Sequence, residues 1–376
     1  MDINNPKDRK AYGTLCGIVG IILNVVLFFV KYFAGLLSGS VAIVADAFNN
    51  LSDAGSSFIT LIGFIFAGKK PDIDHPYGHG RFEYISGFIV SLLIILMGWE
   101  LLQSSGKKIF NPEEVDGKWY TIAILLLSII IKLYMAYYNN SVGKKINSEA
   151  MKATATDSLS DCLSTVVVLI SIIFMNITNI NIDGYCGVLV AIFVTFAGFK
   201  AVKETMAPLL GQPPEPEFVQ HVIDIVMKHE EVNGIHDLVV HDYGPGRRMI
   251  SLHAEVDGNG NIFELHDMID RIENELSDEL FCDAVIHLDP IETDNVVVIE
   301  TKIKVAEKLK EINEHITIHD FRMVTGPTHT NLIFDVVEPY EMKESEQQMR
   351  NLVTTKVKEL DDNYEAVVHI DRSYIS

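Results

Sequence analysis

The run DAFNNLSD, residues 46–53, interrupts a stretch that is otherwise mostly apolar from residue 40 to residue 67. A second polar run, DSLSD at 157–161, interrupts the apolar stretch 152–175 in the same way. An aspartate at the centre of a bilayer costs about 2.5–3.5 kcal/mol on insertion scales. We therefore predict membrane helices whose polar runs carry the function.

Six stretches are long and apolar enough to cross a membrane, which takes about 20 residues. They lie near 12–36, 40–67, 83–104, 120–139, 152–175 and 184–203. Lys and Arg gather in the polar N-terminal segment and in the second and fourth loops; the third loop opposes them and the fifth has none. This bias predicts that both termini and the tail lie in the cytoplasm. The six spans predict a multi-pass protein of the cell membrane, and the polar N-terminus predicts that there is no cleavable signal peptide.

Charge is strongly segregated along the 376 residues. Residues 1–212 hold 16 Lys and Arg and 16 Asp and Glu, whereas residues 213–376 hold 14 and 35 and so carry the whole net charge of −21. The mean hydropathy of the whole chain is +0.21, which is high for a chain with 22% charged residues. This pattern excludes a single soluble globule, a collagen-like fibre and a disordered chain. The acidic tail also argues against a nucleic-acid partner.

The tail after Gly211-Gln212-Pro213-Pro214 is predicted to be soluble α+β, with the ferredoxin-like order α-β-β-α-β. Its predicted helices and strands are 216–229, 235–243, 248–256, 262–279 and 283–289. IHDL at 235–238 returns as IHDF at 318–321, and AVIHLD at 284–289 returns as AVVHID at 366–371. We therefore predict three domains: a transport domain at 1–212, a cytoplasmic domain at 213–293 and a second copy of it at 294–376.

No enzyme signature is present, since HExxH, GxSxG and Walker A patterns are all missing from the sequence. The four cysteines lie far apart and form no CxxC pair. This spacing excludes a disulfide framework and a thiolate zinc cluster. We expect a protein that is not an enzyme and holds no resident cofactor.

The two intramembrane polar runs place oxygen ligands on helical faces. Asp46, Asn49 and Asp53 are spaced i, i+3, i+7, and Asp157 and Asp161 are spaced i, i+4. If the faces meet, the carboxylates repel one another unless a cation or protons neutralise them, so we predict a divalent cation site. The alternative is that they line a water-filled vestibule or cap helix ends. Asp46 fits a proton-handling or a structural role equally well.

The loop DIDHPYGHGRFE, residues 72–83, holds the only two histidines of the first 212 residues. His75 and His79 lie beside Asp72 and Asp74, and imidazole with carboxylate suits a divalent metal. The alternative is a Gly/Pro-rich turn with solvated histidines.

The tail holds the other eleven histidines. Strand alternation places His253 on the face opposite to the apolar residues of 248–256, and it does the same for His287 and Asp289 in 283–289. With His236 and His266 these residues make a candidate metal site; ordinary surface histidines are the alternative. The second copy keeps His319, His369 and Asp371, with Asp335 in place of His253 and Gln348 in place of His266.

The chain combines six spans, polar motifs on the second and fifth, HxxGHG at residues 75–80 after the second and an α+β tail. In this combination it resembles the cation diffusion facilitator family of metal exporters. The resemblance covers about residues 10–293. It implies a homodimer in membrane lipid that exchanges a divalent cation for protons by alternating access. The residues that it assigns to the transport, loop and tail sites are Asn49, Asp53, Asp157 and Asp161; Asp72, His75 and His79; and His236, His253, His266, His287 and Asp289.

Zinc members of this family usually place a histidine among the four transport ligands, and this chain has none, so it resembles the manganese branch. Oxygen ligands suit Mn²⁺, Mg²⁺ or Ca²⁺, whereas imidazole suits Zn²⁺. We expect Mn²⁺ as the transported ion. The rivals are export of Zn²⁺, Fe²⁺ or Co²⁺, a membrane-anchored metal sensor that moves nothing, and an intramembrane metalloenzyme. The second copy of the tail is extra to the family pattern, and metal binding, dimerisation and capping of the first copy remain open for it.

Overall fold

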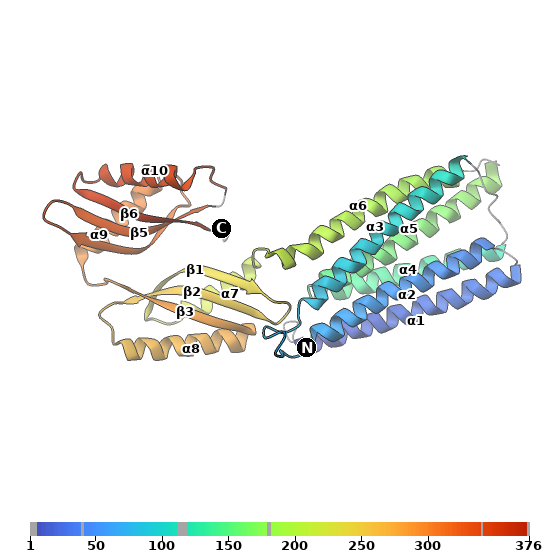
Figure 1. The fold of residues 1–376 in the computed structure, drawn as a ribbon, viewed down its shortest axis with the longest axis horizontal. Helices are drawn as coiled ribbons and strands as arrows, with labels where there is room; N and C mark the ends of the chain where they lie inside the picture. Colours follow the sequence, from blue (N-terminus) through green and yellow to red (C-terminus); the bar gives the residue numbers. More distant parts are fainter. Residues whose placement is uncertain (1–5, 39–40, 111–118, 179–181, 340, 374–376) are drawn as a thin grey trace. The chain divides into compact units, whose positions relative to one another are not determined.

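The computed structural model describes residues 6–38, 41–110, 119–178, 182–339 and 341–373 (Figure 1). The chain divides into two compact units. The first contains residues 1–212 together with the turn 242–247, and the second contains 213–241 and 248–376. Each unit is a structure with its own packing.

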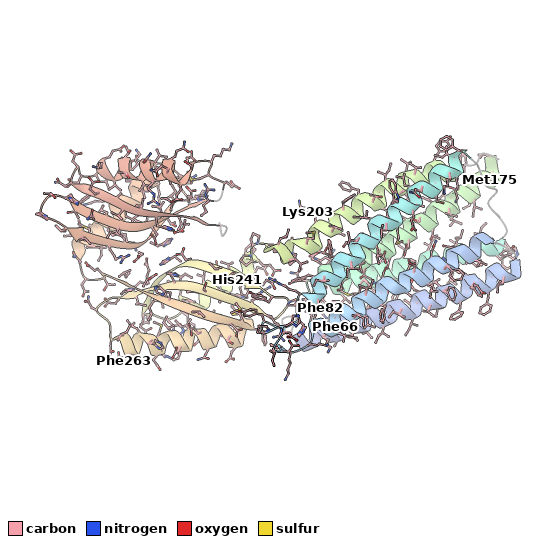
Figure 2. The ribbon with its side chains drawn as sticks, in the orientation of Figure 1. Phe66, Phe82, Met175, Lys203, His241 and Phe263 are labelled. Carbon is pink, nitrogen blue, oxygen red and sulfur yellow. The ribbon has the colours of Figure 1, made fainter. Side chains whose placement is uncertain are left out.

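Six long helices build the described part of the first unit. They are α1 (Pro6–Ser38), α2 (Val41–Ala67), α3 (Phe82–Phe110), α4 (Trp119–Lys145), α5 (Glu149–Thr178) and α6 (Asp183–Leu210). All six contain a window long and apolar enough to span a membrane, which confirms the six predicted spans. Large apolar side chains project outward along the helices (Figure 2), and Phe196 is 73% exposed. Lipid, not water, is the solvent that such a surface requires.

Close helix packing in this bundle depends on glycine. Figure 1 shows α3 beside α6 along most of their length. A Cβ atom at Gly98 would lie 3.0 Å from the backbone nitrogen of Thr195, and one at Gly198 would lie 3.1 Å from that of Ile95. Without side chains at these two positions the backbones can approach, which is how apolar helices gain contact in lipid.

The second unit begins with a lobe of two helices and three strands. They are α7 (Pro216–Val226), β1 (Val232–Asp242), β2 (Arg248–Asp257), α8 (Ile262–Leu280) and β3 (Cys282–Ile291). The sheet order is β1-β2-β3, and β2 runs parallel to β3. This is the predicted α-β-β-α-β order, with each boundary moved by no more than a few residues.

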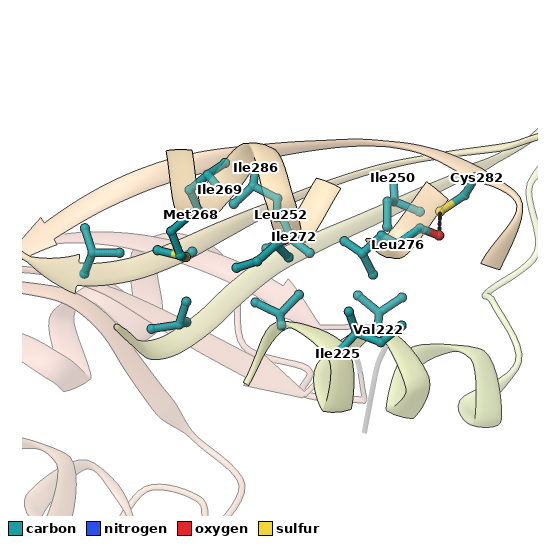
Figure 3. Close-up of a cluster of buried hydrophobic side chains, with 14 of the residues drawn as sticks. Val222, Ile225, Ile250, Leu252, Met268, Ile269, Ile272, Leu276, Cys282 and Ile286 are labelled. Atoms are coloured by element: carbon teal, nitrogen blue, oxygen red, sulfur yellow. Dashed lines mark hydrogen bonds between the residues drawn. The ribbon is translucent and has the colours of Figure 1, made fainter. Parts of the chain in front are cut away.

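One face of this sheet carries the core (Figure 3). Ile250, Leu252, Ala254 and Val256 are each at most 2% exposed, as their alternation along the strand predicts. They pack on apolar residues of both α7 and α8, including Val222, Met268 and Ile272. Both helices therefore cover the same face, and the opposite face is left for the histidines.

A second lobe repeats the order of elements. It consists of α9 (Val296–Leu309), β4 (Thr317–Thr325), β5 (Thr330–Pro339), α10 (Glu346–Lys358) and β6 (Tyr364–Ser373). Its sheet order is β4-β5-β6, with β5 antiparallel to β4 and parallel to β6. His253 pairs with His287 in the first sheet, and Asp335 pairs with His369 in the second. The predicted counterparts thus occupy matching register positions in the two sheets.

Candidate functional site

The aspartates of the two polar runs lie inside the helical bundle. Asp53 on α2 is 6% exposed and Asp157 on α5 is 4% exposed. The side chain of Asp161, one turn after Asp157, is 12% exposed. Burying three carboxylates among apolar helices requires compensating charge, and the neighbouring residues show where part of it comes from.

Lys132 on α4 supplies that charge, and it is not among the site residues predicted from the sequence. Its Nζ atom lies 2.7 Å from Oδ2 of Asp53 and 2.6 Å from Oδ2 of Asp161. Lys132 is itself only 2% exposed. The signal was available, because a lysine in the middle of the predicted span 120–139 is as costly as an aspartate. One ammonium group thus joins α4 to α2 and to α5.

The compensation is incomplete. Oδ1 of Asp157 is buried and has no hydrogen-bond partner within the described part of the chain. The three carboxylates also do not all approach one another within 4.8 Å, so no ready-made three-oxygen cage exists among the described residues in this state. Three carboxylates against one ammonium leave negative charge in a site of low dielectric, which favours the entry of a further cation.

The structure separates the two asparagines of DAFNNLSD. Asn49 is exposed, whereas Asn50 is 2% exposed and donates a hydrogen bond from Nδ2 to the carbonyl oxygen of Asp46 at 2.8 Å. Asn49 lies one turn before Asp53, as predicted, but contributes no described contact to the aspartates. Asp46 forms an ion pair with the buried Lys31 of α1 at 2.8 Å, which favours its structural role.

The predicted loop site is gathered in one place. Nδ1 of His75 and Nε2 of His79 each lie 3.4 Å from a carboxylate oxygen of Asp72. The three residues offer ligand atoms within 4.8 Å of one another. The amide of His75 donates to Asp72 at 2.8 Å, and this hydrogen bond lowers the pKa of Asp72. Nδ1 of the buried His79 has no hydrogen-bond partner among the described residues, so a ligand position remains unsatisfied there.

The tail site centres on Asp289 of β3. Its Oδ2 atom lies 2.8 Å from Nδ1 of His253 and 3.0 Å from Nε2 of His236, and its Oδ1 atom lies 3.4 Å from Nε2 of His287. These four predicted residues are therefore adjacent on the face opposite to the core. His266 is not with them: it lies exposed on α8, 3.5 Å from Asp270. Within a single chain, four of the five predicted tail ligands are therefore together, and His266 lies apart from them.

The second lobe contributes residues to the same place. A cavity of about 350 Å³ is lined by the first-lobe residues His236, His253, His287, Asp289 and Pro290 and the second-lobe residues Asp320, Arg322 and Asp335. The rings of His236 and His319 stack with centroids 4.8 Å apart. Lys302 also reaches Glu255, which is 6% exposed, at 3.5 Å. The histidine face of the first sheet is thus partly covered, which strand alternation alone did not predict.

The charged groups around this cavity shift one another's pKa values in different directions. Burial lowers the pKa of His236, but the hydrogen bond and charge of Asp237 outweigh it and raise the pKa. Burial and the nearby charge of His236 lower the pKa of His319. Burial raises the pKa of Asp335, and the charges of Asp371 and Asp320 raise it further. Acidic groups from both lobes therefore face imidazoles, a donor set that suits a divalent transition metal.

Comparison with known proteins identifies two family domains in this chain. The model of the cation efflux transmembrane domain matches residues 17–210, and that of the cation efflux protein cytoplasmic domain matches 214–291. Residues 292–376 lie outside both matches. The duplication of the tail domain therefore stays a prediction, although the two lobes share one order of elements.

Several curated relatives match along nearly their whole length. An uncharacterised transporter of Methanocaldococcus jannaschii is 31% identical over 276 residues, which are 73% of this chain and 97% of the relative. The manganese efflux system protein MneS of Bacillus subtilis is 27% identical, over 76% of this chain and 98% of its own. A cadmium, cobalt and zinc/H⁺–K⁺ antiporter of the same organism is 25% identical, over 76% and 92%.

The fold, the polar faces of α2 and α5 and these matches lead to one assignment. The protein is a multi-pass membrane protein whose six helices precede a cytoplasmic domain, and the family consists of transporters. This chain belongs to the cation efflux family of metal transporters.

Proposed function

We propose that this chain exports Mn²⁺ and exchanges it for protons by alternating access. Asn49, Asp53, Asp157 and Asp161 bind the ion. Protons compete with the metal for the aspartate oxygens, and their arrival on the far side releases it. No cofactor takes part, because the ion is the substrate.

One observation carries the choice of ion: the buried ligands that α2 and α5 supply are carboxylate oxygens. The only histidines of residues 1–212 are His75 and His79, both outside the helices. Zn²⁺ gains more from imidazole than Mn²⁺ does, so a site without imidazole favours the harder ion. The manganese efflux protein MneS among the relatives supports this choice, whereas the cadmium, cobalt and zinc antiporter keeps Zn²⁺ and Co²⁺ as rivals.

The protein works as a homodimer with its tail in the cytoplasm. The match of residues 214–291 to the family's cytoplasmic dimer domain supports this assembly. The loop site at Asp72, His75 and His79 and the tail site at His236, His253, His287 and Asp289 bind cytosolic metal. His266 lies apart from the other tail ligands in one chain, so a role for it requires a second copy or another state of the tail.

Flux into proteoliposomes tests the proposal. Purified protein is reconstituted, a pH gradient is imposed, and uptake is measured with Mn²⁺ alone and then with Zn²⁺, Fe²⁺ or Co²⁺ as competitor. We expect Mn²⁺ uptake that the pH gradient drives and that collapses when the gradient is dissipated. Uptake that strongly prefers Zn²⁺ would identify the rival substrate. Metal binding without any flux would identify a sensor.

A further inference from the structure

Lys132 occupies the position in which a transported cation would bridge two of its ligands. Its Nζ atom lies within 2.7 Å of both Asp53 Oδ2 and Asp161 Oδ2. These are charge-assisted hydrogen bonds of short length, made simultaneously to two helices. A metal ion bridging the same two oxygens would occupy the space of the ammonium group. Metal and ammonium therefore exclude each other there.

We propose that Lys132 is a tethered counter-ion: its ammonium group holds the cation position while the site carries no metal, and the entering ion displaces it. This inference rests on the proposed use of Asp53 and Asp161 as metal ligands. It means that the affinity for the metal depends on a residue of α4 as well as on the ligands of α2 and α5.

Burial makes this arrangement consequential. The side chains of Lys132, Asp53 and Asp161 are 3%, 8% and 12% exposed, so water screens their interaction very little. Empty of both metal and lysine, the site would hold three carboxylates in a membrane interior. With Lys132 in place the metal-free site is partly neutralised, which lowers the desolvation cost of the return step in which protons replace the metal.

The displaced ammonium has acceptors to move to. Oδ1 of Asp157 and Oγ of Ser128 are both buried and without a hydrogen-bond partner in the described ranges. Ser128 lies one turn before Lys132 on the same buried face of α4. The four-carbon side chain of lysine lets the charge move while the helix stays in place.

The charge count favours a lysine that stays close after displacement. Three aspartates contribute −3, the ammonium +1 and a divalent ion +2, so the loaded site is neutral with Lys132 beside it. Without Lys132 the loaded site would keep one negative charge and hold the ion more tightly. Removing this lysine should therefore strengthen metal binding and slow release, which is the opposite of what the loss of a merely structural ion pair would do.

Three variants and wild type test the inference in proteoliposomes, by initial Mn²⁺ uptake rates over a range of concentrations. K132M removes the charge and keeps most of the volume, and K132R restores the charge. K31M removes another buried lysine, which is paired with Asp46 at 2.8 Å and touches none of the three site aspartates among the described contacts. We expect K132M to lower KM by about tenfold and to lower the maximal rate, K132R to resemble wild type, and K31M to leave KM unchanged.

Equilibrium binding keeps the test valid if K132M transports nothing. Mn²⁺ titration calorimetry on the full chain, with the heat from a D53A/D161A variant subtracted, isolates the intramembrane site from the loop and tail sites. Tighter binding in K132M supports the inference; equal or weaker binding in a protein that remains folded overturns it. If wild type prefers another divalent ion, the same comparison is made with that ion. A wild type that binds metal but moves none refutes the proposed function alone, and the binding comparison still decides the role of Lys132.

Discussion

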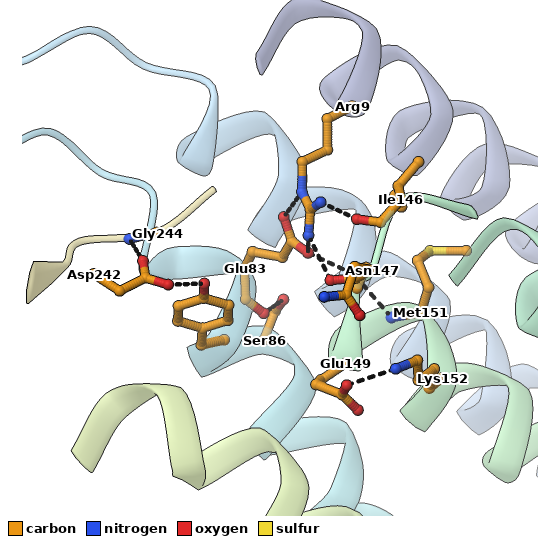
Figure 4. Close-up of polar contacts among 12 residues, drawn as sticks. Arg9, Glu83, Ser86, Ile146, Asn147, Glu149, Met151, Lys152, Asp242 and Gly244 are labelled. Atoms are coloured by element: carbon orange, nitrogen blue, oxygen red, sulfur yellow. Dashed lines mark hydrogen bonds and ion pairs between the residues drawn. The ribbon is translucent and has the colours of Figure 1, made fainter. Parts of the chain in front are cut away.

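Arg9 of α1 and Glu83 of α3 form a buried, two-pronged ion pair at one end of the bundle (Figure 4). Nη2 and Nε of Arg9 donate to the two carboxylate oxygens of Glu83 at 2.8 and 3.0 Å. Arg9 also donates to the carbonyl oxygen of Ile146, and Ser148 donates to Glu83. These contacts link α1 to α3, and they link both helices to the connection between α4 and α5.

Breaking this pair should destabilise the bundle strongly. In E83Q the buried guanidinium loses its counter-charge, which costs about 3–5 kcal/mol at a buried site. The thermal unfolding midpoint in detergent should fall by several degrees. Glu149 provides the control, because its pair with Lys152 at 2.7 Å is more exposed and E149Q should cost at most about 1 kcal/mol. If E83Q and E149Q lower the unfolding midpoint equally, the ion pair of Arg9 with Glu83 has no special role in stability.

The three intramembrane aspartates should each be essential for flux. D53A, D157A or D161A removes a charged oxygen ligand, and we expect each to abolish Mn²⁺ uptake while the protein still elutes as the same oligomer. Glu204 on α6 is the control, since its side chain is 47% exposed and lies 3.8 Å from Lys200. E204A should keep uptake. If uptake persists in any two of the aspartate variants, these aspartates do not form the transport site.

The helices, the core face of β2 and the pairing of the α5 aspartates could be predicted from the sequence. Apolar length predicts the six helices, and the alternation Ile250, Leu252, Ala254 marks the core face of β2. The helical spacing of Asp157 and Asp161 places both near one another. These are local regularities of period 3.6 and 2, which a single sequence displays directly.

Contacts between distant elements were harder to foresee. Spacing along α2 cannot say which neighbour faces it, so the pairing of Asp53 with Lys132 remained hidden although each was visible as a costly charge. Asn49 and Asn50 are adjacent and chemically identical, and only packing makes one exposed and the other buried. The repeat predicts the order of elements in the second lobe, but not that Asp335 lines a cavity with His253.

The second lobe should modulate the tail site without being required for transport. Removing 297–376 should leave residual Mn²⁺ flux, because the family match of the tail ends at residue 291. A truncation that inserts into membranes but is wholly inactive would make the lobe part of the transport machinery.

A point substitution tests the lobe more finely. Asp335 lines the cavity, and D335N removes a negative charge facing the tail histidines. In a D53A/D161A background, we expect roughly threefold weaker metal binding at the tail. D362N, at an exposed position in the turn before β6, is the matched control and should change nothing. If D335N and D362N bind metal equally tightly, the second lobe takes no part in metal binding at the tail.

Cys282 reports on the folding of the first lobe. Its side chain is 4% exposed, and Sγ lies 3.4 Å from the carbonyl oxygen of Leu276 (Figure 3). Burial, with the charge of Asp283, raises the pKa of the thiol from 9.0 to about 11. The neutral thiol is the form that folding favours, so its stabilisation is fully present below pH 9 and is lost as pH rises from 9 towards 11.

Labelling measures this effect. At pH 8 the thiolate is scarce and buried, so alkylation of Cys282, followed by mass spectrometry of its peptide, should be much slower than in urea-unfolded protein. The rate should rise steeply above pH 9. Fast labelling at pH 8 in the folded protein would contradict the packing of this core.

Selectivity should depend on Asn49 rather than on Asn50. An amide oxygen is a neutral donor that does not titrate in the working pH range, so it adds coordination without charge. Zn²⁺ binds more strongly than Mn²⁺ at almost any site, so discrimination must come from ligand type and geometry. N49H places an imidazole one turn before Asp53, and we expect it to raise the ratio of Zn²⁺ to Mn²⁺ flux at a fixed pH gradient. N50H disrupts a buried side chain that hydrogen-bonds within α2, so it should lower both fluxes and leave their ratio unchanged. If N50H changes the ratio and N49H does not, the buried Asn50 is the fourth ligand. Asn49, which is exposed in this structure, would then also be exposed while the protein transports the ion.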